Sequence, residues 1–150
     1  SDIRSSILHN LHERFDVAGI RNYESRMLDL TDPVSPATFS HGEFDGIILD
    51  APCTGSGTWG RTPENLFFFE QPKIARFHAL QKSIAANVIP LLRPGGALIY
   101  ITCSVFEQEN ERVVEYLCKK EGLQWQEGGV IPGYTRGADT MFAARLTKKG

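Results

Sequence analysis

Three segments of the chain carry apolar residues at helical spacing. In residues 5–18 the apolar positions recur every three or four residues, and a glycine follows where a helix would end. The same pattern predicts a long amphipathic helix over residues 73–92, terminated by Pro94, and another helix over residues 107–121. The pattern therefore predicts three helices that each bury one face.

Runs of consecutive apolar residues predict strands between these helices. Residues 44–49 form one such run, which is typical of a strand buried on both faces of a parallel sheet, and residues 97–102 form another. We also expect a short strand at residues 26–28 and a closing pair of strands at residues 123–126 and 140–146. Alternating strands and helices predict an α/β sandwich with a mostly parallel sheet.

Polar and reactive residues follow several of the expected strands. Ligands of parallel sheets bind beyond the carboxyl ends of the strands, where the loops begin. Segments rich in Gly, Pro and Ser predict loops over residues 31–43 and 51–71. The residues expected at this edge of the sheet are Asp2, Asp29, Asp50, Thr102 and Cys103. Their shared position is the first functional signal in the sequence.

The composition is that of an ordinary globular domain. The chain has 150 residues, of which 41% are hydrophobic and 23% are charged. No stretch approaches the roughly 18 apolar residues that span a bilayer, and no basic-then-apolar leader opens the chain. The net charge of -2 gives no sign of a strongly basic domain. Any nucleic-acid contact must therefore be local or lie outside this chain.

The spacing of cysteines and histidines argues against a metal site. The three cysteines form no C-x-x-C pair, and the four histidines show no metal-ligand spacing. So few cysteines also argue against a disulfide framework. We therefore expect free thiols, a reducing compartment and a cytoplasmic location, or a nucleolar one in a eukaryote.

Residues 55–60 match the G-x-G-x-x-G pattern of dinucleotide-binding folds. In those folds the glycines must turn directly from a strand into a helix, whose N-terminus holds the pyrophosphate. Here residues 50–54 intervene after the expected strand, and Pro63 follows soon afterwards in place of a helical pattern. An active-site loop is the favoured interpretation, and a dinucleotide site is the alternative.

Two cysteines come directly after the two apolar strands. Cys53 follows Pro52, which cannot continue a strand, and Cys103 precedes the start of an expected helix. A helix N-terminus lowers the pKa of a nearby thiol and favours the reactive thiolate. A free cysteine is otherwise a small buried hydrophobe, which suits Cys118 on the inward face of its helix. The residues alone leave both roles open for Cys53 and Cys103.

The motifs around these two cysteines resemble those of the NOP2/Sun (Fmu/RsmB-like) RNA cytosine-carbon-5 methyltransferases. The resemblance rests on Asp-Ala-Pro-Cys at residues 50–53, and on Thr-Cys-Ser at residues 102–104 followed by Glu-Asn-Glu at residues 109–111. It continues along nearly the whole chain, in Arg61, Pro63, Glu64, Leu80, Gln81, Leu92, Pro94, Gly95, Gly96 and residues 141–146. It implies a Rossmann-like class I methyltransferase fold with an antiparallel closing strand.

The resemblance implies an enzyme that methylates carbon-5 of cytosine in RNA with S-adenosyl-L-methionine. Ribosomal RNA is the favoured substrate over tRNA. Carbon-5 is too weak a nucleophile unaided, so a cysteine thiolate first adds at carbon-6. The resemblance makes Cys103 this nucleophile and Cys53 the residue that assists product release. Asp50 would contact the cofactor's amino group or the cytosine edge, and a solvated carboxylate at a strand end is the alternative.

Two more carboxylates match cofactor-binding positions of the family. Asp2 matches the acidic residue that binds the ribose hydroxyls, and Asp29 matches the one near the adenine. A capping or loop role competes for Asp29. The family's first strand and glycine-rich first motif would lie upstream of Asp2. We therefore expect residues 1–150 to be a partial catalytic domain that lacks both, together with the RNA-binding segments.

Basic and aromatic residues between Trp59 and Phe77 are candidates for RNA contacts. Arg61 is favoured because it directly follows the glycine-rich loop. The three phenylalanines at residues 67–69 are expected to anchor the loop in the core, since consecutive aromatics are more often buried than offered to bases. The three glutamates within residues 107–111 are expected to be a charge cluster that the helix dipole favours.

Other functions and assemblies stay open on the sequence. A DNA cytosine methyltransferase would use the Pro-Cys cysteine as its nucleophile, and the Thr-Cys-Ser motif argues against it. A non-catalytic RNA-binding or assembly module of the same fold is the second alternative. A sheet without its central first strand would leave unpaired edges. We expect another segment, a homodimer or a swapped assembly to cover them.

Overall fold

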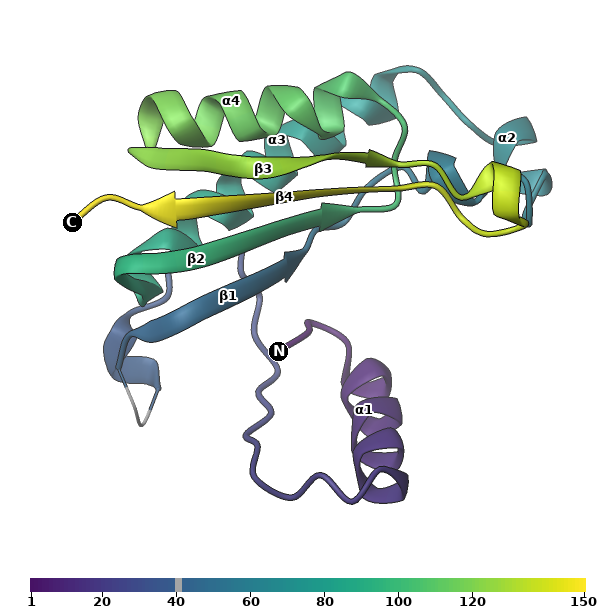
Figure 1. The fold of residues 1–150 in the computed structure, drawn as a ribbon. Helices are drawn as coiled ribbons and strands as arrows, with labels where there is room; N and C mark the ends of the chain where they lie inside the picture. The colour runs from purple at the N-terminus through teal and green to yellow at the C-terminus, as the bar shows by residue number, and fades with distance from the viewer. Residues whose placement is uncertain (40–41) are drawn as a thin grey trace.

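The computed structural model describes residues 1–39 and 42–150. Its helices and strands occur in the order α1 (Ser5–Val17), β1 (Phe44–Asp50), α2 (Glu64–Phe67), α3 (Pro72–Val88), β2 (Leu92–Thr102), α4 (Glu111–Lys120), β3 (Leu123–Ile131) and β4 (Met141–Lys148). The expected alternation of helices and strands is confirmed (Figure 1). Ser40 and His41, in the loop predicted over residues 31–43, lie outside the described residues.

The three predicted helices form close to their expected bounds. Pro72 opens α3, where its missing N–H costs nothing because the first turn has no acceptor for it. The helix ends in the 3-10 turn η3 (Ile89–Leu91). The last predicted helix begins as the 3-10 turn η4 (Glu107–Glu109) and continues as α4. No helix in the described ranges is long and apolar enough to cross a membrane.

The strands differ more from their expected bounds. The strand predicted at residues 26–28 is a single parallel bridge between Asp2 and Met27. β2 begins at Leu92, and the segment expected to separate it from α3 stays extended beside β1. The pairing of β1 with β2 is irregular there. Phe44 lies opposite Leu92, and the next pair is Gly46 with Ala97, which is two residues later on β1 but five residues later on β2. Both closing strands are longer than predicted.

The sheet has the strand order β1-β2-β4-β3. β1 pairs with β2 in parallel, and β4 is antiparallel to both β2 and β3. Three strands therefore run in one direction, and β4 is inserted between two of them in the opposite direction. This arrangement confirms the predicted α/β class with an antiparallel closing strand. It also brings the carboxyl ends of β1 and β2 to one edge (Figure 1).

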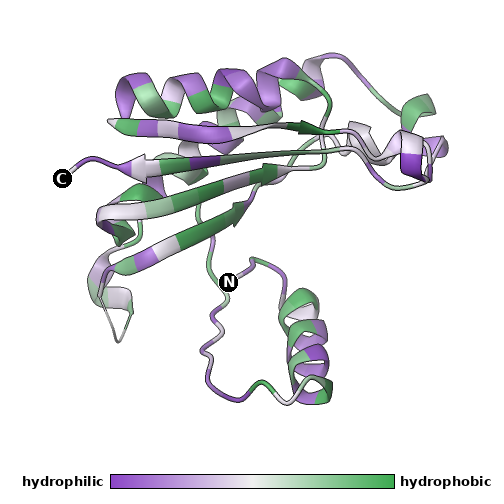
Figure 2. Ribbon diagram, viewed as in Figure 1, coloured by the Kyte–Doolittle hydropathy of each residue, from purple (hydrophilic) through white to green (hydrophobic). Residues whose placement is uncertain are grey.

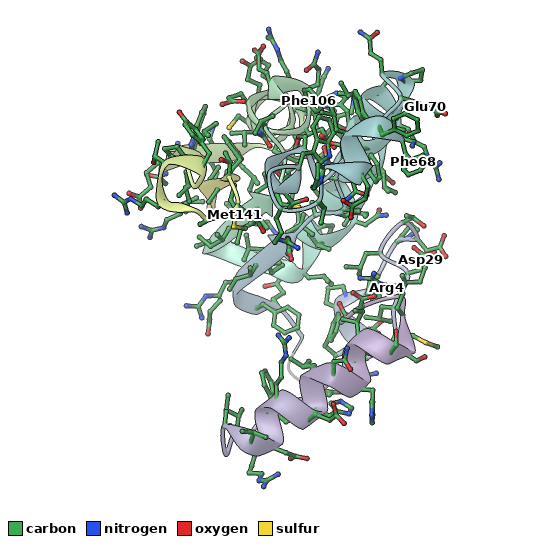
Figure 3. The ribbon with its side chains drawn as sticks, turned by 90° about the vertical axis from the view of Figure 1, so that its right-hand side faces the viewer. Arg4, Asp29, Phe68, Glu70, Phe106 and Met141 are labelled. Carbon is green, nitrogen blue, oxygen red and sulfur yellow. The ribbon has the colours of Figure 1, made fainter. Side chains whose placement is uncertain are left out.

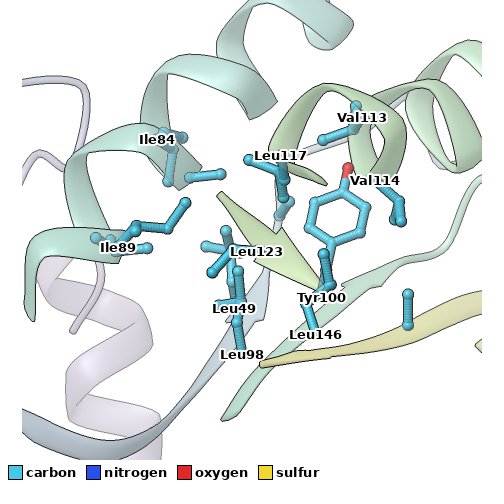
Figure 4. Close-up of a cluster of buried hydrophobic side chains, with 14 of the residues drawn as sticks. Leu49, Ile84, Ile89, Leu98, Tyr100, Val113, Val114, Leu117, Leu123 and Leu146 are labelled. Atoms are coloured by element: carbon cyan, nitrogen blue, oxygen red, sulfur yellow. The ribbon is translucent and has the colours of Figure 1, made fainter. Parts of the chain in front are cut away.

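The hydrophobic core lies between the sheet and the helices α3 and α4, which pack against the same face (Figure 4). Alternate residues of each strand face these helices, so Leu98 and Tyr100 of β2 are completely buried. Helix α4 contributes Val113, Val114 and Leu117, all completely buried as its apolar spacing predicts. The core ends at Thr102, where buried polar residues replace apolar ones.

The opposite face of the sheet carries no such cover in the described residues. Hydrophobic residues continue along β1 and β2 toward their carboxyl ends (Figure 2), yet Ile48 of β1 is 73% exposed. The prediction that residues 44–49 are buried on both faces is therefore wrong for this chain. Ile48 lines an open groove of about 610 Å³ beside the free edge of β1, together with Tyr23, Phe39 and Phe44.

Residues 1–31 form an N-terminal segment that touches the sheet only locally. Helix α1 buries only Leu8, and it stands apart from the sheet in Figure 1. Asn87 of α3 holds the end of this segment, because its Nδ2 donates to the carbonyls of Leu30 and Thr31 at 3.0 and 2.9 Å. The apolar spacing of α1 predicted the helix correctly. Apart from Leu8, however, the residues of its apolar face are half-buried or exposed.

Candidate active site

The two predicted cysteines meet at the carboxyl edge of the sheet. Parallel pairing continues to the strand ends, where Asp50 lies opposite Ile101 and the N–H of Ala51 donates to the Ile101 carbonyl at 2.9 Å. The chain then turns away at both strands. Cys53 and Cys103, 50 residues apart in sequence, come to lie with their Sγ atoms 3.3 Å apart. Both are half-buried free thiols.

The close contact makes the two thiols chemically different. A hydrogen bond from Cys53 lowers the pKa of Cys103 to about 7, and burial and the carboxylate of Asp50 oppose part of this effect. The same hydrogen bond, together with burial, raises the pKa of Cys53. The contact therefore favours ionisation of Cys103 over ionisation of Cys53. The sequence argument attributed a low pKa of Cys103 to a nearby helix N-terminus. In the structure, the largest effect on this pKa comes from the hydrogen bond with Cys53.

A buried carboxylate connects the loops that carry the two cysteines. Glu109 of η4 is completely buried. It accepts hydrogen bonds from the N–H of Thr54 at 2.9 Å and from the hydroxyls of Thr54 and Ser104. The Nε2 of Gln81 donates both to Glu109 at 3.3 Å and to the Pro52 carbonyl at 2.9 Å. Glu109 lies at the start of the last helix, as predicted for the glutamate cluster, but its carboxylate is buried among donors from the two cysteine loops and α3.

The residue after Glu109 holds the loop of Cys103 from its other side. Thr102 donates its hydroxyl to the Oδ1 of Asn110 at 2.6 Å, and the Nδ2 of Asn110 donates to the Ser104 carbonyl at 2.9 Å. Tyr100 donates its hydroxyl to the Glu109 carbonyl at 2.6 Å, and burial raises the pKa of this phenol. The backbone on both sides of Cys103 is thereby fixed. The Glu-Asn-Glu motif marked these residues without showing their contacts.

The glycine-rich loop forms a short turn, η2 (Ser56–Thr58), in place of the helix that a dinucleotide site requires. The N–H of Gly57 donates to the Cys103 carbonyl at 2.9 Å, and its own carbonyl accepts from the N–H of Thr140 at 3.0 Å. A Cβ at Gly57 would lie 1.9 Å from the Thr140 carbonyl oxygen. Glycine is needed here because two backbone segments approach from both sides.

Arg61 lies near the cysteines but is paired. Its Nη2 and Nε donate to the two carboxylate oxygens of Asp139, at 2.8 and 3.2 Å. Arg61 is close enough to Cys103 for the thiolate to contribute to raising the pKa of the guanidinium, after the larger effect of Asp139. The Arg61 side chain remains 65% exposed. It can therefore be reached by a ligand at this edge of the sheet.

The three consecutive phenylalanines do not behave alike. Phe69 is half-buried, and its ring stacks on that of Phe106 at 5.5 Å and approaches Trp59 at 4.9 Å. Phe67 and Phe68 are 85% and 66% exposed. The prediction that the three phenylalanines anchor the loop in the core is therefore wrong for Phe67 and Phe68, and Phe69 packs on Trp59 and Phe106 without joining the core cluster of the described residues. Figure 3 shows Phe68 and Phe106 on the side of the molecule where β1 and β2 end.

The three carboxylates expected at the cofactor lie in two places. Asp50 ends β1 as an exposed residue whose charge acts on Cys103. Asp2 and Asp29 belong to the N-terminal segment, and the bridge from Asp2 to Met27 brings them near each other.

Both carboxylates of the N-terminal segment have local partners. Asp2 accepts hydrogen bonds from the backbone N–H and the guanidinium of Arg4, which lower its pKa. Asp29 accepts from the hydroxyl and N–H of Thr31 at 2.7 and 2.9 Å, and these bonds lower its pKa. The loop role considered for Asp29 is therefore present. Both carboxylates are therefore held by donors two residues away in the same segment.

The part of the chain that the structure describes contains no group of three or more His, Cys, Asp and Glu side chains that could hold a metal ion. Cys118, the third cysteine, packs against the core as expected. At the carboxyl edge of the sheet, Cys103 has the carboxylate of Asp50 and the guanidinium of Arg61 as charged neighbours.

Curated proteins similar to the chain are ribosomal RNA methyltransferases. Ribosomal RNA small subunit methyltransferase B of Cronobacter sakazakii is 37% identical over 116 residues, which cover 71% of this chain and 27% of the relative. Ribosomal RNA small subunit methyltransferase F of Vibrio vulnificus is 32% identical over 116 residues, which cover 76% of this chain and 23% of the relative. The chain thus spans about a quarter of the length of these relatives.

Solved structures share the fold over nearly the whole chain. The crystal structure of PH0851 has a TM-score of 0.85 and 27% identity, and the match covers 98% of this chain and 36% of that one. The structure of NSun6 from Pyrococcus horikoshii with SFG has a TM-score of 0.83 and 22% identity, covering 98% and 40%. The sequence model described as 16S rRNA methyltransferase RsmB/F matches residues 1–128. The chain belongs to the RsmB/F methyltransferase family, as its cysteine motifs predicted.

Proposed function

We propose that this chain carries the catalytic residues of an S-adenosylmethionine-dependent methyltransferase that acts on carbon-5 of cytosine in ribosomal RNA. The observation that carries the proposal is the pair of thiols 3.3 Å apart, with a pKa of about 7 at Cys103. The small subunit rRNA methyltransferases among the relatives support the RNA substrate. Residues 1–150 would be part of the catalytic domain.

Cys103 acts as the nucleophile in this proposal. Its thiolate adds to carbon-6 of cytosine, and the electron pair of the 5,6 double bond is displaced into the ring, which makes carbon-5 nucleophilic. After carbon-5 has gained its methyl group it must lose its proton, which passes to a water molecule at this exposed edge of the sheet. The electron pair of that C–H bond restores the double bond, and the bond from carbon-6 to the Cys103 sulfur breaks. Cys103 leaves as a thiolate again.

Cys53 and Asp50 assist these steps. The S–H of Cys53 donates a hydrogen bond to the Cys103 sulfur, and this bond strengthens as the departing sulfur regains its negative charge. Cys53 therefore assists product release. Asp50, exposed at the end of β1, can accept a hydrogen bond from the cytosine amino group or from the cofactor's amino group.

The residues of this chain fit part of a cofactor site. S-adenosylmethionine, when bound, supplies the electrophilic methyl group that carbon-5 attacks. Asp2 would accept the ribose hydroxyls once Arg4 releases its carboxylate, and Asp29 would lie near the adenine. The described groove beside β1 is lined by neither Asp2 nor Asp29. NSun6 was solved with SFG, an analogue of this cofactor, which supports its use here.

Arg61 is the proposed RNA contact on this chain. It is exposed, lies near Cys103, and is held in a fixed orientation by Asp139. A planar guanidinium with remaining free N–H groups suits a phosphate oxygen or a base edge. Its position would place the backbone of a bound RNA beside the thiol pair.

Covalent trapping tests the proposal. The natural polypeptide that contains these residues is incubated with S-adenosylmethionine and RNA carrying 5-fluorocytosine, whose carbon-5 cannot lose a proton. We expect a stable protein–RNA adduct that Cys103→Ala abolishes and that Cys53→Ala and the control Cys118→Ala retain. An adduct that depends on Cys53 and not on Cys103 would reverse the assignment. Absence of any adduct, with no S-adenosylmethionine binding by calorimetry, would favour a non-catalytic module.

A further inference from the structure

Glu109 is a completely buried carboxylate at the edge of the candidate active site. In the described residues its side chain accepts hydrogen bonds from N–H and O–H donors of Thr54, Gln81 and Ser104. Burying a carboxylate is costly unless hydrogen bonds replace its lost water. Donors alone suit an ionised carboxylate, which has only acceptor atoms. Hydrogen bonds from the protein therefore replace the water that the Glu109 carboxylate loses on burial.

The donors come from the two loops that carry the cysteines. Thr54 directly follows Cys53, and it gives Glu109 both its backbone N–H and its hydroxyl. Ser104 directly follows Cys103 and gives its hydroxyl. Neighbouring Cα atoms are separated by only about 3.8 Å, so fixing Thr54 and Ser104 restricts where the two thiols can lie.

Gln81 of α3 completes the arrangement. Its Nε2 binds the carbonyl of Pro52, the residue before Cys53, and also the carboxylate of Glu109. The backbone of Cys53 is thus held on both sides by groups that meet at one carboxylate. A residue needed only to start a helix would not require contacts with loops 55 residues away.

We propose that Glu109 is a positioning residue, which sets the distance between the Cys53 and Cys103 thiols by holding their loops together. Its catalytic consequence rests on the proposed function, but the positioning itself does not. Loss of the carboxylate would remove the shared acceptor of four hydrogen bonds and free the loops to separate. The hydrogen bond between the thiols would then weaken.

The chain offers a matched control for this role. Glu107 lies two residues away in the same 3-10 turn, but it is exposed and pairs with Arg112 at 3.0 Å. Removing its charge changes the start of the same helix by the same amount. It leaves the contacts of Glu109 in place. Any effect specific to Glu109 therefore reflects the loops and not the helix dipole.

Thiol cross-linking tests the positioning without RNA or cofactor. Diamide oxidises two thiols to one disulfide: the two sulfurs give up two protons and two electrons, and diamide is reduced to the hydrazine. In chains with Cys118→Ala, we expect rapid formation of the Cys53–Cys103 disulfide, measured by mass spectrometry. Glu109→Ala should slow it at least tenfold, Glu109→Gln less because one acceptor oxygen remains, and Glu107→Gln not at all. Equal rates in folded Glu109→Ala and the Glu107→Gln control would overturn the proposal.

Milder variants keep the test decisive if Glu109→Ala does not fold. Thr54→Val and Ser104→Ala each remove one hydroxyl from the carboxylate, and near-ultraviolet circular dichroism checks that the fold persists. We expect each to slow cross-linking at least twofold and the pair of changes to slow it further. Unchanged rates in both folded variants would contradict the positioning role.

The adduct assay separates this inference from the proposed function. In the polypeptide used for trapping, Glu109→Gln should lower the rate of adduct formation with little change in RNA affinity. The substitution shifts the position of the Cys103 thiol but leaves the RNA-binding surface of the protein unchanged. If the unaltered protein forms no adduct, the proposed function fails while the cross-linking result still decides the role of Glu109. If the unaltered protein forms adducts but the Glu109 variants cross-link at the unaltered rate, only the positioning role fails.

Discussion

Replacing Cys53 with alanine should make Cys103 a weaker acid. The hydrogen bond from Cys53 is the largest cause that lowers the pKa of Cys103 from 9.0 to about 7. Without the donor, the pKa of Cys103 should rise toward 9.0. At pH 7 the thiolate fraction would then fall from about one-half to about 1%, roughly a fiftyfold loss.

The expected change in reaction rate is smaller than the change in thiolate. A thiolate of higher pKa is intrinsically more nucleophilic, and a rise of about two units increases its reactivity about eightfold at a Brønsted slope of 0.4–0.5. Alkylation of Cys103 by iodoacetamide at pH 7 should therefore slow about sixfold in Cys53→Ala. Well above pH 9, where both forms are ionised, the same variant should react faster than the unaltered protein.

The assay follows alkylation of the Cys103 peptide by mass spectrometry from pH 5 to pH 10, with Cys118→Ala in every variant. Cys53→Ser is the matched control, because its hydroxyl can still donate to the Cys103 sulfur and should keep the midpoint near pH 7. A midpoint that is the same in Cys53→Ala as in the unaltered protein would refute the assignment of Cys53 as the donor.

Two further predictions concern stability and assembly. Gly57→Ala places a Cβ 1.9 Å from the Thr140 carbonyl oxygen, so urea unfolding should show a loss of about 1–3 kcal/mol or more, whereas Gly60→Ala, with open space around its Cβ, should change little. A loss no greater than that of Gly60→Ala would contradict the close approach. Ile48→Lys should reduce the self-association expected at the free edge of β1, as measured by sedimentation, and an unaltered chain that stays monomeric would contradict that expectation.

The order of helices and strands followed from local patterns. Apolar spacing predicted α1, α3 and α4, and the apolar runs predicted β1 and β2. The side chains of each element face the core at a fixed period, so the pattern can be recognised within ten to twenty residues. The strand expected at residues 26–28 shortened to one bridge because a strand needs a neighbour along its whole length.

Burial was predicted less well than secondary structure. An apolar run was interpreted as a strand covered on both faces, but Ile48 lies in the open. Consecutive phenylalanines were expected inside, yet Phe67 is exposed and Phe69 is not. The pattern predicts Glu109 as part of a charge cluster at a helix start, but it does not indicate that this carboxylate is completely buried. Burial depends on which other element covers a residue. The polarity of the side chain alone therefore does not predict it.

The sequence by itself determined the class of fold, the two cysteine motifs and the family. It placed Cys53 and Cys103 after adjacent strands, because parallel strands present their carboxyl ends at one edge. Only the tertiary structure decided that their sulfurs touch, that Cys103 is the more acidic thiol, and that Glu109 joins their loops. Each of these depends on hydrogen bonds between residues about fifty positions apart. The strength of such bonds depends on distance and burial, which only the folded chain sets.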